Sequence, residues 1–266
     1  MTLLAILVGT LLAGIGSVWV AAWLSFGVLS RYTQHMLSLA AGALMATSFL
    51  HLLPEAFESG VGPHELFLTL LVGLVFFFLL DKAELWHHGH EHGHGHDHGH
   101  AHSHSHAHQH DHLDAPRGQW AVLAGDSVHC FGDGILIASA FMADMHLGMI
   151  AALAVWAHEI PHHMGDLAVL RQGSSSRRAA IVKVSMAGAI TALGGAVGYV
   201  LVDALREWLP FFLVVASSSF VYVALADLIP QLQKRLSARE TAAQILWLSV
   251  GIGMVLLVSA IAGHQH

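Results

Sequence analysis

Eight apolar runs, each long enough to cross a bilayer, constrain the fold of this 266-residue chain more than any other feature. An α-helix needs about 20 apolar residues to span the hydrocarbon core. The chain is 55% hydrophobic and 11% charged, with a mean hydropathy of +0.61, so its charges are too few to cover a soluble globule. We therefore predict an all-α, polytopic membrane protein. The spans are expected at about residues 3–29, 36–58, 64–85, 119–143, 147–170, 180–203, 209–232 and 241–262.

The basic residues predict the orientation of these spans. Lys and Arg collect in the short cytoplasmic loops of membrane proteins. If the N-terminus lies outside, ten of the eleven basic residues fall in cytoplasmic segments, and Arg206 is the exception. An even number of spans then places both termini outside. The ten residues are Arg31, Lys82, Arg117, Arg171, Arg177, Arg178, Lys183, Lys234, Arg235 and Arg239.

Composition also limits the compartment and the partners. The single cysteine excludes a disulfide framework, and a formal charge of −7 offers no basic surface for nucleic acid. The N-terminus lacks the basic segment of a cleaved signal peptide, so Met1 is expected to stay on the protein. We expect a multi-pass protein in contact with the lipid of a cell membrane, specifically a bacterial inner membrane.

A histidine-rich tract separates the third run from the fourth. Fourteen histidines occupy almost every second position of residues 87–112, among small and acidic residues. Such a low-complexity segment cannot pack a core, and neutral imidazoles bind zinc, copper and nickel. We predict a flexible cytoplasmic loop that collects metal; the alternatives are an inert soluble linker and an affinity tag. The chain then divides into residues 1–86 with three spans, a disordered loop at 87–118, residues 119–171 with two spans, and residues 172–266 with three.

The fourth run contains four ligating side chains. His129 and Asp133 are four residues apart and share one face of a helix, while Asp126 and Cys130 flank that face. A buried histidine hydrogen-bonded to an aspartate would explain one such pair. However, an ionisable side chain at the centre of a membrane helix costs about 2.5–3.5 kcal/mol, which favours compensation by a partner or a bound cation.

The fifth run repeats this spacing and strengthens the case for a metal site. His158 and His162 are four residues apart, Glu159 and His163 form a second such pair, and Asp166 extends the row by another turn. Ligands on two neighbouring helices can build one or two tetrahedral metal sites.

Prolines interrupt three of the predicted spans. Pro161 lies inside the fifth span and is expected to kink that helix at the metal site. Pro54 and Pro230 end the second and seventh spans at corresponding positions, which indicates an inverted repeat. Polar residues beside them are candidates for the ion pathway, with His51 and Glu55 at the outer mouth and Asp227 at the inner one.

The order of these motifs resembles the ZIP family of zinc and iron transporters. A span ending in His51-Leu-Leu-Pro-Glu55 precedes the histidine-rich loop, and His129-Cys-Phe-Gly-Asp-Gly134 and His158-Glu-Ile-Pro-His-His-Met-Gly-Asp166 follow it. The chain is most similar to the histidine-rich subgroup whose fifth helix carries His-Glu-x-Pro-His-Glu-x-Gly-Asp.

The resemblance implies eight transmembrane helices in a 3+2+3 arrangement, with a two-metal site on the fourth and fifth. It implies transport of zinc, or of Cd²⁺, Fe²⁺ or Mn²⁺, into the cytoplasm, with no enzymatic activity and no organic cofactor. It also implies a homodimer. By motif position, the first ion is bound by His129, Asp133, His158 and His162, and the second by Cys130 and Glu159 together with Asp133 and His162. Asp126, His163 and Asp166 are secondary candidates.

Three positions depart from the family pattern. Cys130 stands where the family usually has asparagine, His163 replaces the second glutamate of the subgroup, and Gln231 stands where the family often has glutamate. A thiolate favours softer ions such as zinc and cadmium over manganese. The second metal position is therefore expected to bind harder ions weakly.

Two other classes of protein share parts of these motifs. His158-Glu-Ile-Pro-His162 also satisfies His-Glu-x-x-His, which intramembrane zinc proteases use with a distant Asp-Gly such as Asp133-Gly134. A cation-diffusion-facilitator exporter would use a His-x-x-x-Asp pair and a histidine-rich loop. Such exporters usually have six spans and a soluble C-terminal metal domain, whereas only about four residues follow the eighth predicted span here.

Overall fold

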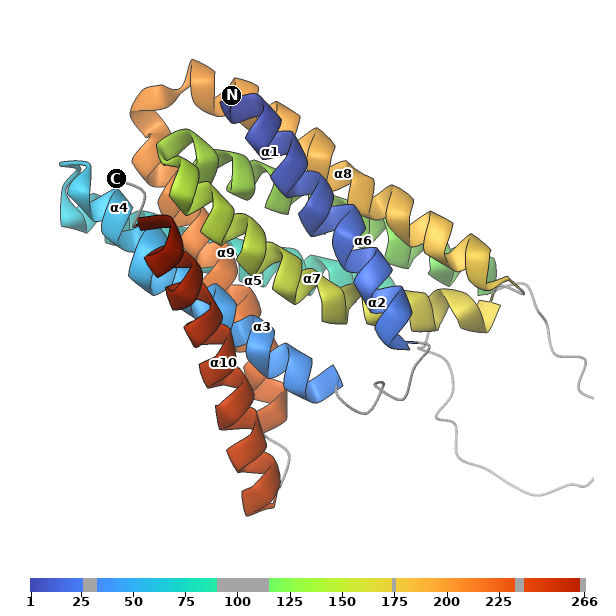
Figure 1. Cartoon of the computed structure of the whole chain (residues 1–266). Helices are drawn as coiled ribbons and strands as arrows, with labels where there is room; N and C mark the ends of the chain where they lie inside the picture. The colour runs from blue at the N-terminus through green and yellow to red at the C-terminus, as the bar shows by residue number, and fades with distance from the viewer. Residues whose placement is uncertain (26–32, 90–114, 174–175, 233–236, 264–266) are drawn as a thin grey trace, which may run out of the picture.

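The computed structural model describes residues 1–25, 33–89, 115–173, 176–232 and 237–263, where all regular structure is helical (Figure 1). The π-helical turns η1 (Leu12–Gly16) and η3 (Ser48–Leu52) join α1 to α2 and α3 to α4, so the described residues form eight continuous rods. A short 3-10 turn, η4 (Arg206–Trp208), precedes α9. The helices are α1 (Thr2–Leu11), α2 (Ser17–Ser25), α3 (Thr33–Thr47), α4 (Leu53–Glu58), α5 (Pro63–Gly89), α6 (Ala115–Ala143), α7 (Met145–Gly173), α8 (Arg177–Ala204), α9 (Leu209–Leu232) and α10 (Ala238–Gly263).

The rods confirm the prediction of an all-α, polytopic membrane protein. Six of them, in the described part of the chain, are long and apolar enough to cross a membrane. The other two, α6 and α7, have 29 residues each, or about 43 Å of helix, and are long enough by the same measure. Both carry the clustered histidines and carboxylates, which make their middle turns less apolar.

The histidine-rich tract lies mostly outside the described residues. Helix α5 continues to Gly89 and α6 begins at Ala115, so both helices extend a few residues into the loop predicted at 87–118. Helix α7 runs from Met145 to Gly173 through Pro161 without interruption. A proline removes one backbone hydrogen bond while the neighbouring bonds of a long, packed helix remain, so the helix continues through it. The kink expected at Pro161 stays a prediction.

The rods pack as two four-helix groups (Figure 1). The first, which we call the ligand bundle, contains α1–α2, α6, α7 and α8, and the second, the partner bundle, contains α3–α4, α5, α9 and α10. They meet where α7 packs on α3 and α10 and where α6 packs on α9. The first rod is thus separated from the second and third, which follow it in sequence, and packs instead with the fourth, fifth and sixth.

The packing agrees with an inverted repeat. In an inverted repeat of these rods, the first corresponds to the sixth, the second to the seventh and the third to the eighth. Exchanging corresponding rods converts the pair α3–α10 into the pair α9–α5, and both pairs are packed. With α6 and α7 exchanged as well, α2–α7 becomes α8–α6 and α3–α7 becomes α9–α6, which are again observed contacts. Proline positions had indicated this symmetry from only two helices.

Glycine contacts hold each bundle together. A Cβ atom on Gly134 of α6 would overlap the carbonyl oxygen of Thr191 on α8, and one on Gly14 would overlap the carbonyl oxygen of Gly188. In the partner bundle, a Cβ on Gly42 would overlap the carbonyl oxygen of Leu248. Backbones approach this closely in membrane proteins where small residues face one another.

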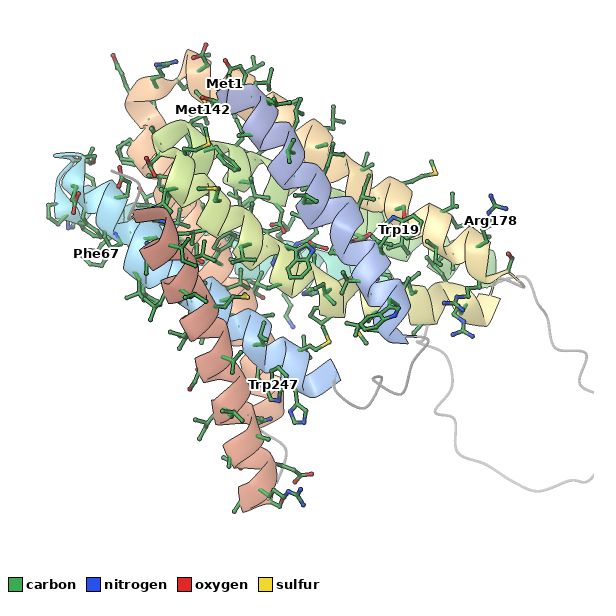
Figure 2. All side chains as sticks on the ribbon, viewed as in Figure 1. Met1, Trp19, Phe67, Met142, Arg178 and Trp247 are labelled. Carbon is green, nitrogen blue, oxygen red and sulfur yellow. The ribbon has the colours of Figure 1, made fainter. Side chains whose placement is uncertain are left out.

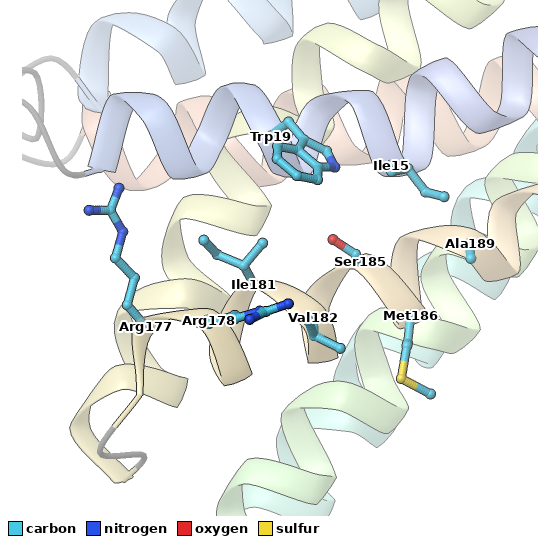
Figure 3. A pocket seen from close by; sticks show the side chains of 9 residues that line it. All are labelled: Ile15, Trp19, Arg177, Arg178, Ile181, Val182, Ser185, Met186 and Ala189. Carbon is cyan, nitrogen blue, oxygen red and sulfur yellow. The ribbon is translucent and has the colours of Figure 1, made fainter.

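The outer surface is apolar, as a lipid-facing surface must be. Trp19, Trp23 and Phe67 are 64%, 74% and 58% exposed, and Figure 2 shows Trp19 and Phe67 on the outside of the helices. A monomeric soluble protein rarely exposes contiguous apolar surface on this scale. A groove of about 850 Å³ between α2 and α8 belongs to this surface, because Trp19, Met186 and the other residues that line it come only from the first and sixth rods (Figure 3).

The start of α1 and the end of α10 lie at the end of the molecule where α4 lies (Figure 1). This placement agrees with an even number of crossings. The side of the membrane on which this end lies stays a prediction.

Candidate metal centre

A tight turn at Asp144 makes α6 and α7 an antiparallel hairpin. The Asp144 carboxylate accepts hydrogen bonds from the backbone N–H groups of His146 and Leu147, at 2.8 and 3.0 Å, and so caps α7. In such a hairpin, residues at similar separations from the turn face one another. Cys130 precedes Asp144 by 14 residues and Glu159 follows it by 15, so the polar clusters of the two helices meet.

The first ligand group contains His129, Asp133, His158 and Glu159, with one candidate ligand atom of each within 4.8 Å of the others. His158 Nε2 lies 3.2 Å from Asp133 Oδ2 and 3.3 Å from His129 Nε2. Glu159 Oε1 lies 3.5 Å from His129 Nε2 and 3.6 Å from His158 Nε2. Ligands about 2.0 Å from a tetrahedral zinc ion are about 3.3 Å apart, so these separations fit one ion.

The second ligand group contains Asp126, Cys130, Glu159 and His163. His163 Nε2 lies 3.1 Å from Glu159 Oε2 and 3.8 Å from Asp126 Oδ1. Cys130 Sγ lies 3.6 Å from Asp126 Oδ1. Glu159 is common to both groups, with one carboxylate oxygen facing each.

Several of the ligating atoms are buried and form no hydrogen bond in the part of the chain that the structure describes. Within the described residues, no hydrogen-bond partner reaches Asp133 Oδ2, either oxygen of Glu159, or Nε2 of His162 and His163. The side chains of Asp133 and Glu159 are 4% and 1% exposed. A buried polar atom without a partner costs about 1–3 kcal/mol, and divalent cations between the two helices would satisfy several such atoms at once.

The structure divides the predicted ligands differently from the family-based expectation. His162 belongs to neither group, although its ring centroid is 5.6 Å from that of His129 and 5.7 Å from that of His158. Asp126 and His163, the secondary candidates, join the second group, while Asp166 joins neither. Glu159 takes the shared position expected for Asp133 and His162. The assignment of individual ligands stays a prediction.

Ser17 contacts the centre from α2, a role that the sequence did not reveal. Its Oγ lies 2.7 Å from the carbonyl oxygen of Gly14 and 3.0 Å from His163 Nδ1. If the hydroxyl donates to the carbonyl, His163 Nδ1–H donates to Ser17 and leaves the Nε2 lone pair directed at the second ligand group. Ser17 is 146 residues from His163 in a span without other polar motifs, so no sequence signal connects them.

The candidate pathway residues lie outside the two ligand groups. His51 is half-buried in η3, and Glu55 is exposed on α4. Asp227 lies in α9, but its side chain is outside the described residues. Their roles in an ion pathway stay predictions.

The chain is similar to known proteins over most of its length. The family model described as "ZIP Zinc transporter" matches residues 1–259. Human zinc transporter ZIP4 is 29% identical over 279 residues, covering 86% of this chain and 42% of that protein. Zinc transporter ZIP13 of Pongo abelii is 27% identical over 281 residues, covering 95% of this chain and 77% of that protein.

A shorter match is with zinc transporter ZIP10 of Danio rerio, 33% identical over 152 residues, which cover 54% of this chain and 18% of that protein. The chain thus spans about two fifths of the length of the ZIP4 proteins and most of the length of ZIP13. Because the family model covers nearly every residue, including both ligand groups, the chain belongs to the ZIP zinc transporter family.

Proposed function

We propose that this protein transports divalent metal ions, zinc above all, across a membrane into the cytoplasm. The observation that supports this most strongly is the pair of buried ligand groups on α6 and α7, which share Glu159. The zinc transporters to which the chain is similar support the choice of ion. Cd²⁺, Fe²⁺ and Mn²⁺ are further candidate substrates.

The ligand groups are proposed to replace the water that an ion sheds in the membrane. His129, Asp133, His158 and Glu159 would bind the first ion, with His162 beside them. Asp126, Cys130, Glu159 and His163 would bind the second. The carboxylates offset the charge of the ion, and binding of a cation displaces protons from the ligands. The soft Cys130 thiolate favours zinc and cadmium over manganese at the second position.

The remaining parts of the proposal concern direction and setting. The predicted orientation puts residues 87–112 on the cytoplasmic side, where their imidazoles would accept the delivered ion. We propose a cell membrane as the location and a homodimer as the assembly. A bacterial inner membrane stays a prediction, and the similar proteins named above come from animals.

The geometry gives no support to a zinc protease. A protease of the His-Glu-x-x-His type needs its glutamate beside a metal-bound water. Here the two oxygens of Glu159 lie 3.1–3.6 Å from imidazole nitrogens of three histidines, as ligands do. The family match also favours a ZIP protein over a cation-diffusion-facilitator exporter.

Uptake of radioactive zinc into proteoliposomes tests the proposal. We expect His129→Ala and His162→Ala to abolish uptake while the protein stays folded, because each removes an imidazole from the buried centre. His64→Ala is the matched control, since His64 is exposed at the start of α5. Zinc movement in the export direction, or peptide cleavage without zinc movement, would contradict the proposal.

A further inference from the structure

A second pair of histidines lies outside the candidate metal centre. His51 is in η3 and His146 is in the first turn of α7, and their ring centroids are 6.4 Å apart with an angle of 67° between the rings. The Nε2 atoms of both rings are shielded from solvent, and neither has a hydrogen-bond partner among the described residues. Neither histidine belongs to a ligand group of the centre.

Two neighbouring imidazoles with unsatisfied nitrogens can share a bridging partner. Each buried nitrogen without a hydrogen bond costs about 1–3 kcal/mol, and one ligand bound by both rings would satisfy both nitrogens. Neutral imidazole nitrogens are good ligands for zinc and other late divalent metals. Two protein ligands leave the remaining positions of an ion to water, so binding would be weak and rapidly reversible.

Among the described residues, no carboxylate joins His51 and His146 in a group of ligand atoms. Asp144 Oδ1 already accepts hydrogen bonds from the backbone N–H groups of His146 and Leu147. Glu55, four residues after His51, is exposed. A site of imidazole and water selects against hard ions such as Mg²⁺ and Ca²⁺, which require oxygen ligands.

The pair lies between the candidate centre and one end of the molecule. His146 precedes His158 by 12 residues on α7, which is about 18 Å of helix. It is next to the Asp144 turn, at the end that the predicted orientation places outside. One turn deeper on the rod of His51, the Thr47 hydroxyl oxygen is also buried and has no hydrogen-bond partner among the described residues.

The two histidines belong to different bundles. His51 is part of the partner bundle, and His146 is part of the ligand bundle. An ion bound to both rings would therefore stabilise the observed arrangement of α7 against η3 relative to any arrangement in which these elements have moved apart.

We propose that His51 and His146 form a third, low-affinity site for a late divalent cation at the outer mouth, bridging the two bundles. The site receives Zn²⁺ before the ion passes to the centre on α6 and α7. The direction of delivery rests on the proposed function, whereas the existence of the site does not.

A binding measurement tests the site separately from transport. The full chain would carry asparagine in place of the fourteen tract histidines, together with His129→Ala, Cys130→Ser and His158→Ala, so that the tract and the centre bind weakly. In this background we expect one zinc ion, with two imidazole ligands by X-ray absorption. Adding His51→Ala or His146→Ala should reduce its affinity at least tenfold, since even changes beyond the ligands cost about 10–100-fold. His64→Ala should leave it unchanged.

If neither His51→Ala nor His146→Ala weakens zinc binding, the site is overturned, and a water molecule alone bridges the rings. If the multiply substituted background does not fold, a metal cross-link gives the answer. In the otherwise unchanged chain, the double substitution His51→Cys/His146→Cys should make zinc uptake more sensitive to micromolar Cd²⁺, and a chelator should restore uptake. Either single cysteine should leave the Cd²⁺ sensitivity of the unchanged chain, whose Cys130 is buried. Insensitivity of the double variant would contradict the bridging geometry.

Transport kinetics test delivery. His146→Ala in the otherwise unchanged chain should raise the KM for zinc about tenfold or more with little change in the maximal rate, because an entry site acts before the centre. An unchanged KM, with the ion bound as expected, would refute delivery and leave the transport proposal intact. Absence of uptake by the unchanged protein, with the ion still bound, would refute the transport proposal instead.

Discussion

Glu159 connects the two ligand groups of the candidate centre. Its Oε1 lies 3.5 Å from His129 Nε2, and its Oε2 lies 3.1 Å from His163 Nε2. The side chain is 1% exposed and has no hydrogen-bond partner among the described residues. A buried carboxylate in this position supplies negative charge to both ion positions at once, where the low dielectric makes that charge most effective.

The substitution Glu159→Gln should therefore weaken both positions together. Glutamine keeps the size of the side chain but loses the charge and replaces one oxygen by an NH₂ group that repels a cation. We expect zinc affinity to fall about 100-fold or more at both positions, which isothermal titration of the purified protein would measure. Glu65→Gln is the control, because Glu65 is exposed at the start of α5. A variant that loses one ion and keeps the other at full affinity would show that Glu159 is not shared.

Ser17→Ala should affect the second position selectively. Without the hydroxyl, His163 Nδ1 loses the partner that orients the ring, and affinity at that position should fall about 10–100-fold. Ser17→Thr retains a hydroxyl and should restore most of the affinity. Ser139→Ala is a matched control, since this buried hydroxyl donates to the carbonyl oxygen of Ile135 on its own helix, at 2.9 Å. Equal zinc affinity in Ser17→Ala and the unchanged protein would exclude an orienting role.

At the scale of elements, the contact of α6 with α8 fixes the position of α6 and of the ligands that it carries. Gly134 directly follows Asp133, and a Cβ atom there would overlap the carbonyl oxygen of Thr191 and approach the backbone nitrogen of Gly195 to 2.6 Å. A Cβ atom on Gly194 of α8 would likewise overlap the carbonyl oxygen of Phe131 on α6. The position of Asp133 along and around α6 thus depends on two backbones in direct contact.

Gly134→Ala should push these helices apart. Overpacking of this kind costs about 1–3 kcal/mol, so the thermal unfolding midpoint in detergent should fall and zinc affinity at the first ligand group should weaken. Gly132→Ala is an unusually close control, because a Cβ atom on Gly132 meets nothing within 4 Å. There alanine should be neutral or slightly stabilising, since it favours the helix. Equal midpoints for the two variants would show that the α6–α8 contact is looser than described.

At the scale of the whole molecule, the two bundles place the ligands and the outer histidine pair on different bodies. Both ligand groups belong to α6 and α7, within one bundle, so relative movement of the bundles leaves these ligands together. The pair His51–His146 spans the interface and would be changed by the same movement. Such an arrangement allows an ion to be carried by one bundle and released from contacts with the other.

The predicted orientation can be tested on the intact protein. Ser59 and Ala238 are exposed residues next to helix ends, and the predicted orientation puts Ser59 outside and Ala238 in the cytoplasm. Ser59→Cys should react with a membrane-impermeant maleimide in intact cells, and Ala238→Cys only after permeabilisation. The unchanged chain serves as the blank, because its one cysteine, Cys130, is buried. The reverse pattern of labelling would invert the orientation and the proposed direction of transport.

The amino-acid sequence alone was enough to predict the class of fold and the helices that carry the ligands. Apolar runs are a local property of the sequence, and they predicted where the helices lie. The i, i+4 spacing of His129 with Asp133 and of His158 with His162 is also local, and it predicted which helices carry ligands. The short connection at Asp144 even implies that the two clusters meet. The helix continues through Pro161, because packing along a 29-residue helix outweighs the loss of one hydrogen bond.

The grouping of the ligands and the residues that surround them depend on how the helices pack. Whether Glu159 or Asp133 is shared depends on how α6 and α7 are rotated about their axes, which spacing along one helix does not specify. Ser17 reaches His163, and His51 reaches His146, across separations in sequence of 146 and 95 residues. These contacts follow from how the rods pack into two bundles, and that packing is set by backbone approach at glycines throughout the chain rather than by any single motif.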